Sequence, residues 1–387
     1  MARVRLFASL RELAGQQEID VEAATVEEVV RTLGDKFGER FEEIARAGSV
    51  VVDGERAAFE TRLRGGEEVA LLPPVSGGRE GVRPRPQRVL LVANPVARTV
   101  SRATLNVLEK ALSADFKLDV DETTGRGHAV ELARRAAADG YDMMVVFSGD
   151  GTVNEAINGL AGTDVALGVI PGGATNVVAR VLGLPENPVH ATDALIRAAL
   201  AGKARRIGLG NADGRRFAFA CGIGVDADAM GEVDERNAES KRAFQRAALS
   251  AVLRSVFFRY AGRRPFLTVW VDDAPPVEAV SVLVGRSNPY TFYKKWGLKV
   301  TPEATLQDGL DVLAVKRLTR RSAPRLVFQL FVTGNHTKRR NMAYRHDASR
   351  VEVRGSDPFP VQLDGDYIGI RERMSVHLER EALWIVG

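Results

Sequence analysis

Residues 142–155 read Asp-Met-Met-Val-Val-Phe-Ser-Gly-Asp-Gly-Thr-Val-Asn-Glu, an apolar run followed by two closely spaced glycines. An uninterrupted apolar run of this length is typical of a strand buried on both faces of a parallel sheet. Gly149 and Gly151 let a ligand approach the backbone closely, and the N–H groups at the start of a following helix favour an anion. The segment therefore predicts a strand, a phosphate-handling loop and a helix, with an ordinary β-turn at Ser148–Gly151 as the alternative.

Asp150 is unusual for a loop that binds phosphate, because a carboxylate repels phosphate unless a metal ion lies between them or the carboxylate binds a sugar hydroxyl. A nucleotide that carries Mg²⁺ would resolve this conflict. Thr152 can either cap the following helix or touch a phosphate. Taken together, these residues predict a Mg-nucleotide at the loop.

A second segment, residues 167–180, repeats the design of strand, glycine loop and helix: Leu-Gly-Val-Ile-Pro-Gly-Gly-Ala-Thr-Asn-Val-Val-Ala-Arg. Asn94 ends an earlier apolar run, and Thr123 follows the next one. Open α/β sheets bind ligands in the crevice at the carboxyl ends of their strands. Four such strand ends with turn residues and polar groups predict a nucleotide site.

Apolar runs alternate with helical patterns from residue 88 to residue 206, which predicts a parallel α/β layer covered on both faces. The expected strands are residues 88–93, 117–121, 142–147 and 166–170, and the expected helices are 101–113, 129–138 and 154–160. Beyond residue 207 the pattern changes to short strands with one long basic helical stretch, residues 234–260. Residues 207–387 are therefore expected to form a β-rich, sandwich-like domain whose last residues can return to the α/β domain.

Residues 1–78 differ from the remainder in charge, with 10 Lys and Arg against 15 Asp and Glu. This −5 segment leaves +9 for the rest of a chain whose net charge is +4, which favours separate folding units. Its expected elements are strands 3–8, 17–21, 49–52 and 68–72 and a helix opened by Thr25. Prolines and charges in residues 79–87 predict a linker.

Residues 4–15, Val-Arg-Leu-Phe-Ala-Ser-Leu-Arg-Glu-Leu-Ala-Gly, and the tail Pro-Pro-Val-Ser-Gly-Gly at 73–78 resemble the ubiquitin-like sulfur carriers, namely the molybdopterin synthase small subunit and its thiamine-pathway relative. The resemblance implies a β-grasp fold for residues 1–78 and a tail, Gly77-Gly78, whose terminal carboxylate becomes a thiocarboxylate. Here Arg79 follows Gly78. A carrier role therefore needs release after Gly78, and otherwise the module serves a docking partner or is vestigial.

The two glycine loops resemble the catalytic domain shared by diacylglycerol kinases, sphingosine kinases and bacterial lipid kinases, which is related to NAD kinase; the resemblance covers residues 88–387. It implies an NAD kinase-like α/β domain and ATP as the cofactor. The ATP contacts that it implies are Asn94, Pro95, Val96, Ala97, Arg98, Thr123, Gly149, Asp150, Gly151, Thr152, Val153, Asn154, Glu155, Ala174 and Thr175. The chain departs from the family pattern at three places. The family usually has glycine at Ser148, often has Ser-Gly at Ala97-Arg98, and usually has a hydroxyl residue at Ala174.

Two carboxylates, Asp364 and Asp366, flank one glycine in residues 361–369, Val-Gln-Leu-Asp-Gly-Asp-Tyr-Ile-Gly. On an extended strand they would share a face and address one site, and a positioned carboxylate suits phosphoryl transfer to an alcohol. Asp-Gly is equally a strong hairpin signal. By resemblance, Asp366 takes the position of the family's glutamate base, with Asp364 and Asp150 as the other candidate catalytic residues.

Residues 307–312, Gln-Asp-Gly-Leu-Asp-Val, resemble the Asp-Gly-x-x-Asp segment that holds a structural Mg²⁺ in this family. The implied ligands are Asp308 and oxygens of Thr305 and Leu310, which are hard donors suited to Mg²⁺. A plain hairpin turn is an equal alternative.

Composition limits the cellular setting and the partners. One cysteine, Cys221, excludes an internal disulfide, and neither a signal-peptide pattern nor an apolar run of the roughly 18–20 residues needed for a membrane span occurs. We expect a cytoplasmic protein with at most peripheral contact at the inner membrane face. Residues 236–264 are basic and apolar, which fits either a surface on anionic lipid or a solvated helix face. Nucleic acid is not expected as a partner, because no reading motif is present.

The leading interpretation is an ATP- and Mg²⁺-dependent kinase that phosphorylates a hydroxyl of diacylglycerol or a related membrane lipid. A homodimer is compatible with the sequence. One alternative is an NAD kinase-like enzyme with a soluble acceptor. Another is a sulfur-carrier or binding protein with a degenerate kinase domain.

Overall fold

The computed structural model describes residues 2–387 except Phe7, Gly48, Gly54, residues 73–84, Arg98, residues 236–246, 248–249 and 294–295, Ser322 and Val332. The tail glycines Gly77 and Gly78 and the predicted ATP contact Arg98 thus lie outside the described residues. The chain divides into two compact units, Met1–Gly77 and Gly78–Gly387.

The smaller unit confirms the expected β-grasp fold. Its described strands form one sheet in the order β2-β1-β5-β3-β4, in which β1 is antiparallel to β2 and parallel to β5. The elements are β1 (Ala2–Leu6), α1 (Ala8–Ala14), β2 (Glu18–Val21), α2 (Val26–Phe37), α3 (Glu39–Ala47), β3 (Ser49–Val52), β4 (Glu55–Ala57) and β5 (Glu68–Leu72). Thr25 caps α2 as expected, because its hydroxyl accepts the Glu28 N–H at 3.3 Å. The expected strand 3–8 was too long, and α1, α3 and β4 were not predicted.

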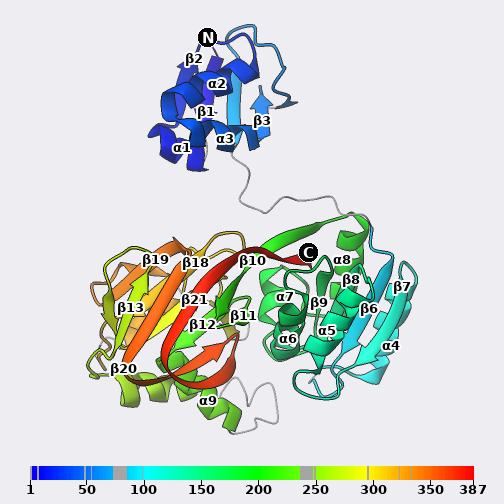
Figure 1. The fold of residues 1–387 in the computed structure, drawn as a ribbon, viewed down its shortest axis with the longest axis vertical. Coiled ribbons are helices and arrows are strands. Elements are labelled where there is room, and N and C mark those ends of the chain that lie inside the picture. Colours follow the sequence, from blue (N-terminus) through cyan, green and yellow to red (C-terminus); the bar gives the residue numbers. More distant parts are fainter. Residues whose placement is uncertain are drawn as a thin grey trace. The chain divides into compact units, whose positions relative to one another are not determined.

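The α/β layer of the larger unit contains parallel strands in the order β7-β6-β8-β9. Its strands are β6 (Arg88–Ala93), β7 (Lys117–Glu122), β8 (Met143–Ser148) and β9 (Ala166–Pro171), and its helices are α4 (Arg102–Ser113), α5 (His128–Ala138), α6 (Asp150–Leu160), α7 (Val177–Val181) and α8 (Pro188–Leu200). Figure 1 shows helices on both faces of these strands.

Strand β6 shows why the apolar runs are continuous. Val89, Leu91 and Ala93 belong to a core that contains residues of α4 and α8, whereas Leu90 and Val92 belong to the core that contains residues of α5 and α6. Successive side chains of a strand point to opposite faces, so a sheet covered on both faces needs apolar residues at every position. The parallel α/β prediction is confirmed.

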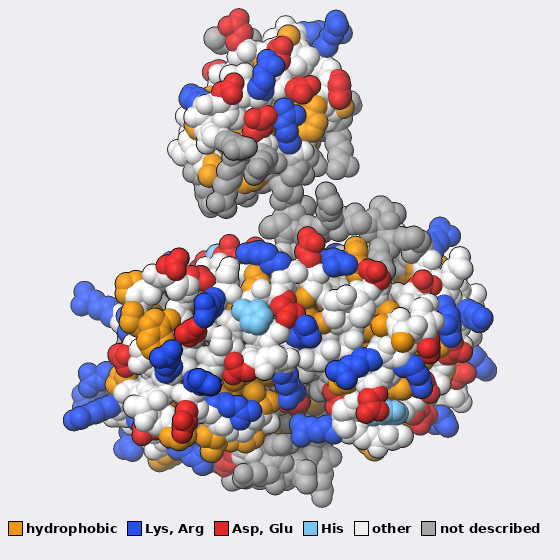
Figure 2. Space-filling model, viewed as in Figure 1, with side chains coloured by type: hydrophobic (Ala, Val, Ile, Leu, Met, Phe, Trp, Pro, Cys, Tyr) orange, Lys and Arg blue, Asp and Glu red, His pale blue; other side chains and the backbone are white. Residues whose placement is uncertain are grey.

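The β-rich domain extends the same sheet, which has 14 strands in the described part of the chain. Its strands are β10 (Ala204–Ala212), β11 (Arg215–Phe217), β12 (Ala220–Ile223), β13 (Leu267–Val271), β14 (Val277–Ala279), β15 (Ser281–Gly285), β18 (Leu310–Val315), β19 (Met342–Ala348), β20 (Arg350–Leu363) and β21 (Asp366–Val386), with a separate pair β16 (Thr291–Tyr293) and β17 (Trp296–Leu298). Helices α9 (Val225–Glu235) and α11 (Ala323–Phe331) accompany them. Lys and Arg side chains alternate with Asp and Glu over much of the face shown in Figure 2.

Strand β21 connects the two domains of the larger unit. It pairs with β20 and β10, and near its end Ile385 lies opposite Leu167 of β9. In Figure 1 this strand, in red, runs from the β-rich part to the α/β part. The predicted helical stretch 234–260 is only partly described: α9 ends at Glu235, and a π-helical segment covers Ser255–Tyr260.

Candidate active site

The two glycine loops pack backbone against backbone. A Cβ on Gly173 would lie 2.5 Å from the Gly149 Cα, and a Cβ on Gly172 would lie 2.9 Å from the Ser148 Cα. The Gly172 N–H also donates to the Ser148 carbonyl at 2.8 Å. Glycine is thus required at both positions, and the loops after β8 and β9 form one surface at the strand ends.

Asp150 joins these loops through a helix cap. It is the first residue of α6, and its Oδ1 accepts the Val177 N–H at 2.7 Å, at the start of α7. Burial raises the pKa of Asp150 to about 6, against backbone hydrogen bonds from the start of α7 that lower it. At least one of its oxygens therefore holds the fold rather than a ligand.

Thr152 does not cap α6, because Gly149 occupies that position without a side-chain hydrogen bond. Its hydroxyl instead accepts the Asn94 amide at 3.2 Å and the Ser148 hydroxyl at 2.9 Å. Ser148, which departs from the family pattern, thus has a partner within the loop. These three side chains bring the ends of β6 and β8 together.

Several predicted ATP contacts are buried or form hydrogen bonds within the protein. Val153 is buried in the core, and the Asn154 amide donates to the Asp364 carboxylate at 2.8 Å. The Glu155 carboxylate accepts the N–H groups of Gly127 at 2.8 Å and Ala129 at 3.2 Å, at the start of α5. Asn154 and Glu155 therefore position their neighbours and do not face an open site.

The loop after β6 is more accessible. Pro95 and Val96 are exposed, and the Asn94 side chain accepts the Val96 N–H at 3.1 Å, which turns the chain there. The Ala97 N–H donates to the Asn94 carbonyl, and the N–H of buried Thr123 donates to the Ala93 carbonyl. The ends of β6 and β7 are thus adjacent, as the predicted crevice requires.

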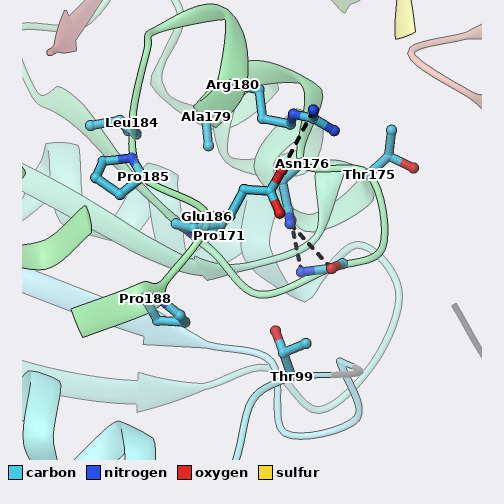
Figure 3. A pocket seen from close by; sticks show the side chains of 11 residues that line it. Thr99, Pro171, Thr175, Asn176, Ala179, Arg180, Leu184, Pro185, Glu186 and Pro188 are labelled. Carbon is cyan, nitrogen blue, oxygen red and sulfur yellow. Dashed lines mark hydrogen bonds and ion pairs between the residues drawn. The ribbon is translucent and has the colours of Figure 1, made fainter. Parts of the chain in front are cut away.

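A hollow lies beside the second loop, between Thr99 and the segment that carries Thr175 and Arg180 (Figure 3). Thr175 lines it, and Ala174 is not among its described lining residues. The guanidinium of Arg180 lies 3.5 Å from the Glu186 carboxylate and 3.7 Å above the Phe292 ring. Thr99 was not predicted, although its N–H donates to the Gly172 carbonyl and so ties it to this loop.

Asp364 and Asp366 do not share the face of an extended strand. Asp364 and Gly365 have φ values of 49° and 86° and form the two-residue turn of the β20–β21 hairpin, with Leu363 opposite Asp366. Asp-Gly suits this turn because both positions need positive φ. The expected shared face was wrong, and the hairpin alternative is the observed one.

Asp364 is buried within the protein. Its carboxylate accepts the N–H groups of Ala218 at 2.7 Å, Phe219 at 2.9 Å and Ala220 at 2.9 Å, besides the Asn154 amide. Burial raises the pKa of Asp364 to about 6, against these hydrogen bonds, which lower it. With four donors on two oxygens, Asp364 acts as an anchor for the hairpin.

Asp366 faces the glycine loop. Its Oδ1 would lie 3.9 Å from a Cβ on Gly151, in the first turn of α6. Two guanidinium groups flank the carboxylate: Arg215 at 2.8 Å and Arg126 at 3.5 Å. The sequence reading assigned neither arginine to the site, although Arg126 belongs to the glycine-containing turn that follows β7.

The loop predicted to bind structural Mg²⁺ contacts a buried guanidinium. Arg286 is fully buried, and its guanidinium donates to the carbonyls of Asp308, Gly309 at 2.6 Å, Leu306 at 2.7 Å and Gly208 at 3.0 Å. Burial lowers the pKa of Arg286 to about 10, so it stays charged at neutral pH.

The side chains of the predicted ligands are also engaged. The Thr305 hydroxyl donates to the Asp308 carboxylate at 2.6 Å, and Leu310 begins β18. No cluster of three His, Cys, Asp or Glu residues able to hold a metal occurs among the described residues. The Asp347 carboxylate also lies at this loop, where it accepts the Gly309 N–H at 2.6 Å. A magnesium ion bound by Thr305, Asp308 and Leu310 stays a prediction from the resemblance.

Comparison with known proteins agrees with this architecture. The diacylglycerol kinase catalytic domain model matches residues 88–212, the YegS C-terminal NAD kinase beta sandwich-like domain model matches 220–385, and the ThiS family model matches 4–78. The Bacillus subtilis diacylglycerol kinase is 30% identical over 301 residues, which cover 76% of this chain and 94% of that protein. The Staphylococcus saprophyticus diacylglycerol kinase is 26% identical over 73% of this chain and 90% of that protein. A crystal structure of a diacylglycerol kinase from Bacillus anthracis matches with a TM-score of 0.58 at 21% identity, over 79% of this chain and 98% of that one.

The chain combines an α/β layer that has two glycine loops at its strand ends with a β-rich domain that places Asp366 beside the first loop. The family models and the named relatives identify it as an enzyme of the lipid kinase class. Membership of a kinase family implies the use of ATP. The chain belongs to the diacylglycerol kinase family and carries a ThiS-type domain at its N-terminus. In the described residues, no helix is both long and apolar enough to cross a bilayer.

Replacing Arg286 with methionine is expected to destabilise the larger unit by about 3 kcal/mol or more, because several buried carbonyls lose their donor at about 1–3 kcal/mol each. Urea unfolding followed by circular dichroism measures this, with Arg134→Met on the exposed face of α5 as the matched control. Added Mg²⁺ is not expected to restore the stability of Arg286→Met. Full recovery with Mg²⁺ would show that the loop is a metal site.

The raised pKa of Asp364 predicts a pH dependence of stability. Because its folded pKa of about 6 exceeds the ordinary value of 3.8, the carboxyl contributes stability below about pH 4 that is lost as the pH rises through about 6. The stability advantage of the wild type over Asp364→Asn should therefore shrink by about 1 kcal/mol between about pH 5 and pH 7. Urea unfolding over this range tests it, and an advantage that grows with pH would show that the hydrogen bonds outweigh burial.

Proposed function

We propose that this protein transfers the γ-phosphate of Mg-bound ATP to a hydroxyl of diacylglycerol or a related membrane lipid, with Asp366 as the general base. The observation that carries the proposal is the position of Asp366, which the β20–β21 hairpin holds over the first turn of α6. A base for phosphoryl transfer has to lie beside the phosphate loop, within reach of the acceptor hydroxyl.

The phosphates would bind where the two glycine loops meet. Backbone N–H groups at the start of α6 would contact the phosphates there, because the N-terminus of a helix and its dipole favour negative charge. Thr152 and Thr175 are the predicted hydroxyls that remain partly exposed at this edge. When bound, Mg²⁺ would neutralise charge on the phosphate oxygens. Asp150 could offer it only the oxygen that does not accept the Val177 N–H of α7.

Arg126 and Arg215 would supply the remaining positive charge. Both contact the Asp366 carboxylate in the structure. Phosphate oxygens are strong guanidinium partners, so a bound nucleotide would compete for these arginines and free the carboxylate. This exchange would couple nucleotide binding to activation of the base.

The transfer itself would be a single displacement. The acceptor hydroxyl gives its proton to Asp366 while its oxygen forms a bond to the γ-phosphorus, and the bond from that phosphorus to the bridging oxygen breaks. ADP leaves with the electron pair of that bond, and Asp366 later returns the proton to solvent. Positioning and charge neutralisation provide most of the catalysis in such a reaction.

Substitution of Asp366 by asparagine tests the base. We expect kcat for diacylglycerol phosphorylation to fall roughly 10²- to 10⁴-fold, the usual range for loss of a general base, with KM for ATP changed far less. Labelled ATP with a panel of diacylglycerol, sphingoid base, phosphatidylglycerol and NAD measures the rate and identifies the acceptor.

Two further variants complete this test. Asp366→Glu, which restores the residue usual in the family, is expected to retain activity, and Glu372→Gln on the exposed part of β21 serves as the control. Equal turnover by Asp366→Asn and wild type would rule out Asp366 as the base. Phosphorylation of NAD alone would replace the lipid acceptor with a soluble one.

For the N-terminal unit we propose a docking or regulatory role, which its ThiS-family match and intact β-grasp core support. Sulfur transfer would require release after Gly78, because the reacting group is a terminal carboxylate. A homodimer and residence at the inner membrane face remain predictions from the sequence.

Intact-mass measurement of protein isolated from its native host distinguishes the roles of this unit. The docking role predicts the uncut chain throughout. A fragment that ends at Gly78 would contradict it and support sulfur transfer, and a Gly78→Pro variant that abolishes the fragment would locate the cleavage.

A further inference from the structure

Residues 312–346 have a distinctive charge pattern. They contain nine Lys and Arg and no Asp or Glu, in a chain whose totals are 54 and 50. The nine cations are Lys316, Arg317, Arg320, Arg321, Arg325, Lys338, Arg339, Arg340 and Arg345. A segment of this length without one acidic residue creates a strongly positive local potential.

The fold gathers part of this charge around one hollow. Arg317 follows β18, Arg325 lies on α11, and Arg339 and Arg340 precede β19; all four line the hollow with Thr319, Gln329 and Asn341. Arg317, Arg325 and Arg340 are exposed. The charges therefore come from three separate elements that converge on one place.

These four arginines form no ion pair within the part of the chain that the structure describes. No carboxylate of the described residues lies within ion-pair distance of them. In the α/β layer, by contrast, ion pairs with carboxylates are formed by Arg88, Arg102, Arg135 and Arg197. In addition, the donor atom Nη1 of Arg339 is buried without a hydrogen-bond partner in the described structure. Buried polar atoms usually have partners, so this hollow has unused capacity for an anionic group.

Large apolar side chains lie on the neighbouring elements. Phe328 of α11 is 59% exposed, although Leu326 on the same helix is buried. Trp296 of β17 is 64% exposed, and the same strand leads to Lys299, whose N–H donates to the Leu330 carbonyl of α11. Exposed aromatic residues beside a cationic patch are typical of peripheral membrane surfaces.

The face continues to the π-helical segment Ser255–Tyr260. The Gly262 N–H donates to the Leu318 carbonyl, and the Arg320 side chain donates to the Phe257 carbonyl at 3.2 Å. Phe258, the next residue, is 76% exposed. The loop after β18 thus links the arginine hollow to the end of the basic stretch 236–264.

We propose that this surface, defined by Arg317, Arg325, Arg339, Arg340, Phe258 and Phe328 and called here the α11 face, docks on a bilayer that contains anionic phospholipid. The arginine hollow would take a lipid phosphate, and the two phenylalanines would enter the interfacial layer. In Figure 2 basic side chains also project along the edge of the β-rich domain near β13 and β20. A membrane is favoured over nucleic acid, because the aromatic side chains flank the cations rather than alternate with them as stacking platforms.

This inference rests on the proposed function and deepens it. An enzyme that phosphorylates a membrane lipid has to bind the bilayer, and we assign that contact to the α11 face. It differs from the expectation based on residues 236–264 alone, since most of its charge comes from residues 317–340. Vesicle binding does not depend on catalysis, so the two proposals can fail separately.

Co-sedimentation of the full chain with vesicles tests the α11 face. Wild type is expected to bind phosphatidylcholine vesicles that contain phosphatidylglycerol and to bind pure phosphatidylcholine vesicles at least tenfold more weakly. The triple variant Arg317→Gln/Arg325→Gln/Arg340→Gln should lose at least tenfold in affinity for the anionic vesicles, and Phe328→Ser several-fold. All four side chains are exposed, and circular dichroism checks that the variants fold.

Matched controls come from the α/β layer. Lys110→Gln/Arg134→Gln removes two exposed cations, and Val107→Ser removes an exposed apolar residue; both should leave vesicle binding unchanged. Equal binding by wild type and the triple variant would overturn the proposal. So would tighter binding of duplex DNA than of anionic vesicles, or full displacement from vesicles by millimolar inorganic phosphate at constant ionic strength, since the latter would indicate a site for the free anion.

Turnover separates docking from chemistry. With diacylglycerol in nonionic detergent micelles, the triple variant should match wild type, whereas on anionic vesicles it should turn over at least tenfold more slowly. A loss of micelle activity in the triple variant would contradict a docking role. If wild type phosphorylates no lipid in either system, the proposed function fails while the vesicle-binding result still decides the α11 face.

Discussion

The buried carboxylate of Asp364 sets the geometry of the site. It accepts backbone N–H groups from the turn between β11 and β12 and the amide of Asn154 on α6. Because the hairpin belongs to the β-rich domain and α6 to the α/β layer, one side chain joins the two domains. A buried carboxylate is stable only with such partners. The position of Asp366, two residues further on, follows from this anchor.

Other acidic residues near the loops have the same structural use. Asp150 caps α7 and Glu155 caps α5, so each turns a carboxylate toward a helix N-terminus, where the helix dipole is favourable. The edge that would face a nucleotide is then left to backbone N–H groups, hydroxyls and the two arginines beside Asp366. This division would explain how acidic residues can surround the proposed phosphate loop without repelling phosphate.

The predictability of each feature depends on how local its cause is. Strands β6, β8 and β9 were predicted to within one residue at each end, because a strand buried on both faces requires a continuous run of apolar residues. Helix α3 was missed, although Phe41 and Ala45 are buried at helical spacing. The roles of Asp364 and Arg215 could not be predicted, because their partners lie 144–210 residues away and no local pattern encodes such contacts.

Arginine shows the same limit most clearly, because one residue type has three environments in this chain. Arg286 is enclosed by carbonyls, Arg215 pairs with the candidate base, and Arg340 projects from a face without a carboxylate among the described residues. Burial makes the first structural, since an enclosed guanidinium needs all its partners within the fold. Partial exposure would let the second exchange a carboxylate for a phosphate, as proposed above. The third has no carboxylate partner among the described residues, so its charge would be available to a surface that the protein meets from outside.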